Sequence, residues 1–226
     1  MADDLAGRRV LITSGPTRAP IDAVRYIENR SSGQLGTCIA RQALARGAQV
    51  VLVAGPASRT PDPDALTPGQ RERLHVVAIE TVPDLVAALE AELTGPAPPD
   101  AVIHAMAVLD YVPADTAAGK TPSGRQEWLV RLVRTPKVIL RIRDLAPRAC
   151  LVGFKLEVGR TEEELRETAL KSLRASRADL VVANDLNGIT ADRHPALILA
   201  PDGTVLARPS TKAEIAARLC DLLAGR

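Results

Sequence analysis

The chain has 226 residues, which suffice for one large domain or two small ones, and its 46% of hydrophobic residues provide ample material for a buried core. Only 2% of the residues are aromatic, and 29 basic against 27 acidic residues leave a net charge of +2. This composition argues against a dedicated nucleic-acid binder, which would use a basic surface or aromatic side chains on which bases stack.

The three cysteines and three histidines predict neither a disulfide framework nor a metal site. The cysteine count is odd and no Cys-x-x-Cys pair occurs, so small core residues are the simpler interpretation. The first ten residues contain no apolar signal region, and no run approaches the ~18 apolar residues of a membrane span. We therefore expect a soluble, cytoplasmic protein with no membrane partner.

Short apolar runs alternate with amphipathic stretches along the chain. In chain order, the predicted strands are 9–14, 49–56, 74–80, 101–108, 150–156 and 178–185. The first helical pattern runs from Leu35 to Gly47, and later helices begin at the capping patterns Thr81 with Asp84, Thr161 with Glu164 and Thr211 with Glu214. Residues 196–209 predict a hairpin that turns at 201–203.

The predicted strands are continuous apolar runs, which indicates burial on both faces, and their alternation with helices indicates a parallel sheet. We predict one α/β domain over 1–226. Its fold would be Rossmann-like and doubly wound, a mainly parallel sheet with helices on both faces, with a C-terminal β-hairpin and a flexible active-site loop. Two segments break the rhythm: the Pro-rich 58–73, expected to be a surface excursion, and the small, polar and flexible 114–127.

Polar residues follow the predicted strands at the edge where open α/β sheets bind ligands. Gly15 and Thr17 lie in a turn after the first strand whose backbone N–H groups could cradle a phosphate, although an ordinary loop is the alternative. Ser31, Ser32 and Gly33 precede a helix whose free N–H groups favour an anion, with a plain N-cap as the alternative. Nearby, the Asn29 amide could donate to a carbonyl or an oxyanion.

Four more residues are candidates for nucleotide contacts. Asp110 could accept a hydrogen bond from a ribose hydroxyl or a base amine, and Lys120 could close over phosphates from its flexible segment. Lys155 interrupts an apolar run, so it needs an anion from Glu157, another side chain or a ligand. Asn184 could be a ligand contact or a turn residue. Taken alone, Asp110 is also typical of a turn and Lys120 of a solvated loop.

A nicotinamide-dependent oxidoreductase is an alternative that the details disfavour. No Gly-x-Gly-x-x-Gly follows the first strand, and the second strand ends without an acidic residue for the adenosine ribose. The Tyr-x-x-x-Lys pair of short-chain dehydrogenases is missing, and Gly-Lys-Thr at 119–121 lacks the first glycine of a P-loop.

Taken in order, the motifs resemble the phosphopantothenate–cysteine ligase family, also called phosphopantothenoylcysteine synthetase. The resemblance spans nearly the whole chain, through VLITSGPTRAPIDAVRYIENRSSGQLG, AVLDY, GKTPS, RTPKVI, GFKLE, DLVVANDLN and the TKAEIA helix. The TPKVI and GFKLE motifs look more like the stand-alone bacterial ligases than the fused forms, which carry a flavin decarboxylase domain upstream.

The resemblance implies an enzyme of coenzyme A biosynthesis. Such enzymes join 4′-phosphopantothenate to L-cysteine through an acyl-nucleotide and release pyrophosphate and a nucleoside monophosphate. The co-substrate would be CTP, giving an acyl-cytidylate, or else ATP, and Mg²⁺ would assist. Family members are homodimers, so part of 14–30 or 112–134 is expected to cross an interface.

The resemblance also implies a role for individual residues. Asn29 matches the family residue that contacts the acyl intermediate, and Lys120 matches the loop lysine that helps to form it. The remaining matches are the first loop with Gly15 and Thr17, the phosphate-binding turn with Ser31, Ser32 and Gly33, the substrate wall with Arg30, and the nucleotide contacts Asp110, Lys155 and Asn184. Pro16 and Ala19 depart from the usual first loop, so a non-catalytic nucleotide-binding paralogue is the alternative.

Overall fold

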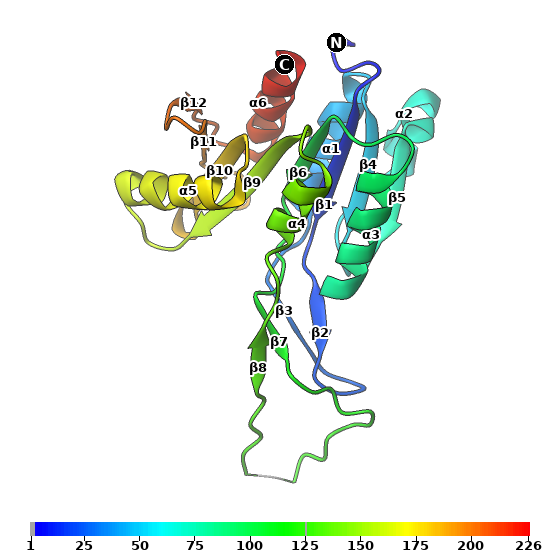
Figure 1. The fold of residues 1–226 in the computed structure, drawn as a ribbon, viewed down its shortest axis with the longest axis vertical. Coiled ribbons are helices and arrows are strands. Elements are labelled where there is room, and N and C mark those ends of the chain that lie inside the picture. Colours follow the sequence, from blue (N-terminus) through cyan, green and yellow to red (C-terminus); the bar gives the residue numbers. More distant parts are fainter. Residues whose placement is uncertain (1–2, 125) are drawn as a thin grey trace.

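A computed structural model describes residues 3–124 and 126–226, which fold around an eight-stranded sheet (Figure 1). The strand order is β12-β11-β10-β9-β6-β1-β4-β5. The parallel strands are β1 (Arg9–Ser14), β4 (Gln49–Ala54), β5 (Leu74–Ala78), β6 (Ala101–His104), β9 (Cys150–Glu157) and β10 (Leu180–Asp185). The antiparallel hairpin of β11 (Leu197–Leu199) and β12 (Val205–Ala207) completes one edge, which confirms the predicted mainly parallel sheet.

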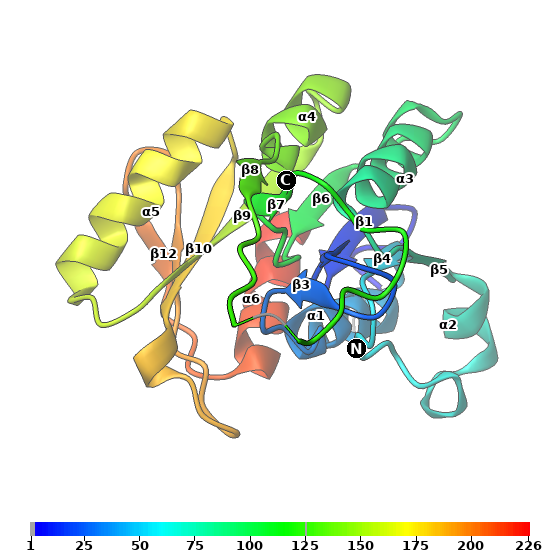
Figure 2. The same cartoon turned by 90° about the horizontal axis from the view of Figure 1, so that it is seen from below.

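Helices pack on both faces of this sheet (Figure 2). One face carries α3 (Val82–Thr94), α4 (Val138–Leu145) and α5 (Glu162–Ser176), and the other carries α1 (Gln34–Ala45) and α6 (Lys212–Ala224). Side chains of a strand point alternately to the two faces, so Leu11 packs with α3 while Val10 and Ile12 pack with α1. The doubly wound arrangement is therefore confirmed. The three cysteines are free thiols; Cys220 is buried, as expected of a core residue, whereas Cys38 and Cys150 are only half-buried.

The capping patterns begin helices as predicted. Thr81 and Asp84 form a capping box at the start of α3, and Thr161 and Glu164 form another at the start of α5. At α6, the Thr211 hydroxyl accepts from the Glu214 amide. Because each cap satisfies free N–H groups of a first turn, it fixes where that helix begins.

Four short strands that the sequence analysis missed build an arm beyond the carboxyl ends of β1 and β6 (Figure 1). β2 (Arg18–Pro20) pairs with β3 (Tyr26–Glu28), and β7 (Tyr111–Pro113) pairs with β8 (Leu132–Arg134). We call residues 18–28, 111–124 and 126–134 the arm. The segment 114–127, predicted as a loop, is irregular where the structure describes it, and residue 125 lies outside the described residues, as do residues 1–2 of the predicted domain.

Two more segments differ from expectation. The fourth strand ends at His104, not at residue 108, because the backbone then turns and the Ala107 amide donates to the Gly15 carbonyl at 2.8 Å. The excursion 58–73 contains a 3-10 helix, η1 (Pro63–Ala65), and a short helix, α2 (Pro68–Glu72). That the chain forms a single domain remains a prediction.

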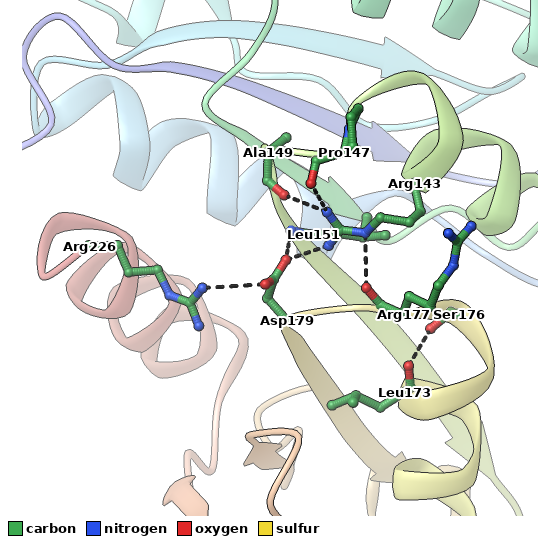
Figure 3. Close-up of polar contacts among 9 residues, drawn as sticks. All are labelled: Arg143, Pro147, Ala149, Leu151, Leu173, Ser176, Arg177, Asp179 and Arg226. Atoms are coloured by element: carbon green, nitrogen blue, oxygen red, sulfur yellow. Dashed lines mark hydrogen bonds and ion pairs between the residues drawn. The ribbon is translucent and has the colours of Figure 1, made fainter.

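A buried arginine joins three elements at the amino ends of β9 and β10, which lie at the end of the sheet opposite the arm (Figure 3). The Arg143 guanidinium pairs with Asp179 and donates at 2.9–3.1 Å to the carbonyls of Pro147, Ala149 and Arg177. Asp179 also accepts from the Leu151 amide at 2.8 Å. This Arg143 cluster fixes the end of α4 to the start of β9 and the end of α5.

Candidate active site

The parallel strands end together on the side of the sheet from which the arm projects (Figure 1). Ser14, His104, Glu157 and Asp185 are the last residues of β1, β6, β9 and β10. In open α/β sheets this edge binds ligands. The predicted site residues lie on these strand ends, on the start of α1 and on the arm.

Two glycines with positive φ, Gly15 (φ 82°) and Gly33 (φ 69°), lie close together around Ser58. A Cβ on Gly15 would lie 1.6 Å from the Ser58 hydroxyl oxygen, and one on Gly33 would lie 2.9 Å from the Ser58 Cβ. Only glycine combines this backbone conformation with such close packing. The turn after β1 and the start of α1 therefore both pack against Ser58, and both glycines are buried. Sequence reasoning found both glycines and missed Ser58, which lies in the supposed excursion.

The N-terminus of α1, next to this packing, has no side-chain cap. Gly33 is the N-cap residue and supplies no side chain, and the first turn contains no acidic residue. The Ser14 hydroxyl donates at 3.0 Å to the Gly33 carbonyl, and the Ser32 carbonyl accepts from the Arg59 amide at 2.9 Å. The free N–H groups of the first turn and the helix dipole together favour an anion such as phosphate. Ser31 is half-buried beside this turn.

Asn29 connects the stretch before α1 to the segment after β6. Its Nδ2 atom donates to the carbonyls of Ala107 and Val108, at 3.3 and 3.1 Å. Thr17 is fully buried, and its hydroxyl accepts from the Leu109 amide at 3.0 Å. This bond helps to fix the backbone of the segment that follows β6. A nucleotide contact of Thr17 stays a prediction. Arg30 is exposed next to Asn29, where its predicted substrate contact is also untested.

A buried pair that sequence reasoning missed lies under this segment. The Thr13 hydroxyl is 2.8 Å from His104 Nδ1 and also accepts from the Met106 amide at 3.4 Å. Burial lowers the pKa of His104 to about 4, so the imidazole is neutral at physiological pH. The predicted strand 101–108 placed His104 in its interior. A histidine inside an otherwise apolar run was the signal that could have identified it.

The candidates for nucleoside binding lie farther along the same edge. Lys155 pairs with Glu157 at 3.0 Å, which confirms that this half-buried ammonium needed an anion. Asp110 is exposed and pairs with Lys137 at 2.7 Å. Asn184 is buried at the end of β10, beside the β9 strand that carries Lys155.

A second buried histidine contacts this group. Nδ2 of Asn184 lies 3.3 Å from Nε2 of His194, whose Nδ1 atom is buried without a hydrogen-bond partner within the described residues. Burial lowers the pKa of His194 to about 4, and the nearby Lys212 acts in the same direction. The side chain of Asn184 therefore contacts a neutral imidazole.

Lys120 is not brought to these residues within one chain. The segment that joins β7 and β8 lies at the end of the arm, away from the ends of β9 and β10 (Figure 1). Its backbone is fixed to the turn between β2 and β3, where the Asp22 carboxylate accepts from the Thr121 amide at 3.0 Å. The lysine side chain itself is exposed.

No group of three or more His, Cys, Asp or Glu residues in 3–124 and 126–226 has the arrangement of a metal site. Within the same ranges, no helix combines the length and the apolarity needed to cross a lipid bilayer.

Comparisons with known proteins connect this geometry to a family. The chain is 39% identical over 217 residues to the coenzyme A biosynthesis bifunctional protein CoaBC of Thermococcus kodakarensis, covering 96% of this chain and 51% of that protein. It thus spans about half the length of this curated relative. Among solved structures, the DNA/pantothenate metabolism flavoprotein of Streptococcus pneumoniae is 31% identical with a TM-score of 0.85, covering 97% of this chain and 99% of that one.

The C-terminal domain of a CoaBC protein is also similar, with 29% identity, a TM-score of 0.78 and coverage of 99% of this chain and 97% of that chain. Residues 5–225 match the family model described as the DNA/pantothenate metabolism flavoprotein C-terminal domain. The sequence resemblance is thereby confirmed, and the chain belongs to this family of C-terminal domains.

Proposed function

We propose that the chain is a phosphopantothenate–cysteine ligase of coenzyme A biosynthesis. One observation carries the proposal. The uncapped start of α1 follows Gly33, which packs with Gly15 against Ser58, and the Asn29 amide just before it is bonded to the segment after β6. Such a helix start suits a phosphate next to a reacting carbonyl. The names of the curated relatives support the pathway.

In the first step, the carboxylate of 4′-phosphopantothenate attacks the α-phosphorus of a nucleoside triphosphate. An O–P bond forms, the α–β bridge breaks, and pyrophosphate leaves with the electron pair. The start of α1 beside Gly15 and Gly33 holds phosphate oxygens, while Asp110, Lys155 and Asn184 hold the nucleoside. Lys120 stabilises the negative charge that develops at the phosphates.

In the second step, the amine of L-cysteine attacks the acyl carbonyl. The amide bond forms, the nucleoside monophosphate leaves with the electron pair, and the amine loses a proton. Two backbone carbonyls already accept from the Nδ2 atom of Asn29, which fixes its Oδ1 atom as the acceptor that would orient the attacking amine beside the acyl carbonyl. We propose CTP, and therefore an acyl-cytidylate, as the preferred route, with ATP as the alternative.

Mg²⁺ would enter with the triphosphate, because phosphate oxygens and water are its usual ligands in nucleotide sites. Its contribution would be to neutralise the charge of the triphosphate.

We also propose that the chain acts as a homodimer through the arm. Several apolar side chains of the arm are exposed, namely Val24, Tyr26, Tyr111, Trp128, Leu129, Leu132 and Val133. Burying them against a second copy would remove apolar surface from water. An arm that reaches a second copy would also bring Lys120 to that copy's site.

The test is pyrophosphate release with 4′-phosphopantothenate, L-cysteine and Mg²⁺, comparing CTP with ATP. We expect release that requires phosphopantothenate and is faster with CTP. Folded protein that binds nucleotide but releases no pyrophosphate would instead identify the non-catalytic paralogue. The altered first loop favours that second candidate, since Pro16 lacks a backbone donor and Ala19 is buried without a carboxylate.

A further inference from the structure

We infer that Asp22 is a positioning residue that docks the Lys120 segment onto the turn between β2 and β3 through the backbone of Thr121. The inference rests on the proposed role of Lys120, because its kinetic consequence concerns that residue. Asp22 and Thr121 are 99 residues apart in the chain, and their contact joins the β2–β3 ribbon to the segment after β7.

The Asp22 carboxylate is fully buried and uses both oxygens. Oδ1 accepts from the amides of Val24 and Arg25, each at 2.8 Å, and thereby closes the turn between β2 and β3. Oδ2 accepts from the Thr121 amide at 3.0 Å. The turn itself needs only Oδ1, so the second oxygen is free to dock the segment.

Arg25 binds the other backbone group of Thr121, its carbonyl. Its guanidinium donates to the Thr121 carbonyl at 3.0 Å, lies 3.5 Å from Asp22 Oδ2, and stacks 4.7 Å from the centre of the Trp128 ring. Both backbone groups of Thr121 are thus bonded to side chains of one turn. We call Asp22, Arg25, Thr121 and Trp128 the latch.

Further bonds extend the docked segment. The Ala117 amide donates to the Ile21 carbonyl and the Thr116 hydroxyl donates to the Pro20 carbonyl, both at 3.1 Å. The segment is therefore fixed on the N-terminal side of Lys120 as well as at the residue that follows it.

The Asp22 carboxylate is ionised at neutral pH. The Thr121 amide is the largest influence on its pKa, and with the amides of Val24 and Arg25 it outweighs burial, so the pKa falls to about 2. A charged acceptor makes a stronger hydrogen bond than a neutral one. The latch is therefore closed at every pH at which the enzyme would work.

Docking limits where the Lys120 ammonium can go. With its backbone neighbour held, the lysine samples only its own side-chain rotamers instead of the range of a free loop. Positioning a catalytic cation beforehand lowers the entropy cost of reaching the transition state. A loss of docking should therefore lower kcat while leaving nucleotide affinity nearly unchanged.

Asp22→Asn tests the inference, because the amide keeps an oxygen for the turn and places an NH₂ group against the Thr121 N–H. We expect faster hydrogen exchange at the Thr121 amide and a changed fluorescence of Trp128, the single tryptophan of the chain. We also expect kcat for pyrophosphate release about tenfold lower, with KM for the triphosphate changed less than about twofold. Lys120→Ala gives the reference for complete loss of the lysine.

Asp202→Asn is the matched control. Asp202 also accepts from a nearby backbone amide, that of Thr204 at 2.8 Å, but it lies in the β11–β12 hairpin. This variant should change none of the three measurements.

Several outcomes would overturn the latch. One is a Thr121 amide of the unmodified chain that exchanges as fast as an exposed loop amide, a measurement that needs no variant to fold. Another is an Asp22→Asn variant with unchanged exchange and fluorescence, or with an unchanged or higher kcat. If the unmodified chain releases no pyrophosphate, the proposed ligase function fails, whereas exchange and fluorescence still decide whether Asp22 docks the segment.

Discussion

Gly15→Ala should destabilise the chain by two separable effects. At φ 82° an alanine is in the left-handed region, where a Cβ costs about 1–2 kcal/mol. The new methyl would also lie 1.6 Å from the Ser58 hydroxyl oxygen and 2.8 Å from its Cβ, so the turn or Ser58 must move. Overpacking of this kind costs about 1–3 kcal/mol. The expected total is about 2–5 kcal/mol.

Gly7→Ala separates the two effects, because Gly7 has a similar φ of 77° and no atom within 4 Å of its would-be Cβ. It should cost only the backbone part, about 1–2 kcal/mol. Adding Ser58→Gly to Gly15→Ala should recover most of the overpacking part. Urea unfolding gives the three free energies, and binding of the triphosphate reports whether the turn has moved.

Equal destabilisation by Gly15→Ala and Gly7→Ala would refute this reasoning, because it would show that Ser58 does not limit the turn. So would a Gly15→Ala variant that binds the triphosphate as tightly as the unmodified chain. The first result would contradict the packing between the turn and Ser58, and the second would contradict the proposed role of the turn in phosphate binding.

Two further predictions concern polar groups under and beside the same turn. Asn29→Asp places a carboxylate against the carbonyls of Ala107 and Val108; it should slow amide formation at least about tenfold more than acyl-nucleotide formation, and equal single-turnover rates for both steps would count against Asn29. The folded state lowers the pKa of His104 from 6.5 to about 4, so the neutral imidazole contributes stability above pH 6.5 that is lost as the pH falls toward 4. The loss should approach about 1.4 kcal/mol per pH unit, and His104→Gln should reduce this slope in urea unfolding between pH 7 and 5; an unchanged slope would show that His104 does not titrate as described.

The sheet was predictable because its signals are local. The parallel strands are mostly apolar runs. The start of a helix such as α3 is marked by a threonine and a carboxylate three residues apart. Helix α4 lacked this signal, since Lys137 precedes it without a side-chain cap. The arm was missed because strands of three residues, such as β2, carry too little periodicity to detect.

The site was predictable only in part, for a related reason. Gly15, Gly33 and Asn29 lie in motifs whose residue types indicate their chemistry. Ser58 and the Asp22–Thr121 contact depend on which distant segments meet, and nothing local marks them. The Lys155–Glu157 pair is an intermediate case, in which burial predicted the need for a partner and the sequence offered one two residues away.

The Arg143 cluster and the Lys137–Asp110 pair connect the two ends of the parallel strands through helix α4. Helix α4 has eight residues and is therefore about 12 Å long. Arg143 fixes its far end, while Lys137, directly before its first turn, pairs with Asp110 at the strand ends. A short helix held at both ends transmits a displacement rather than absorbing it. A substitution at the amino ends of β9 or β10 is therefore expected to reach the Lys137–Asp110 pair as well, so the two ends of the parallel strands are mechanically coupled through α4.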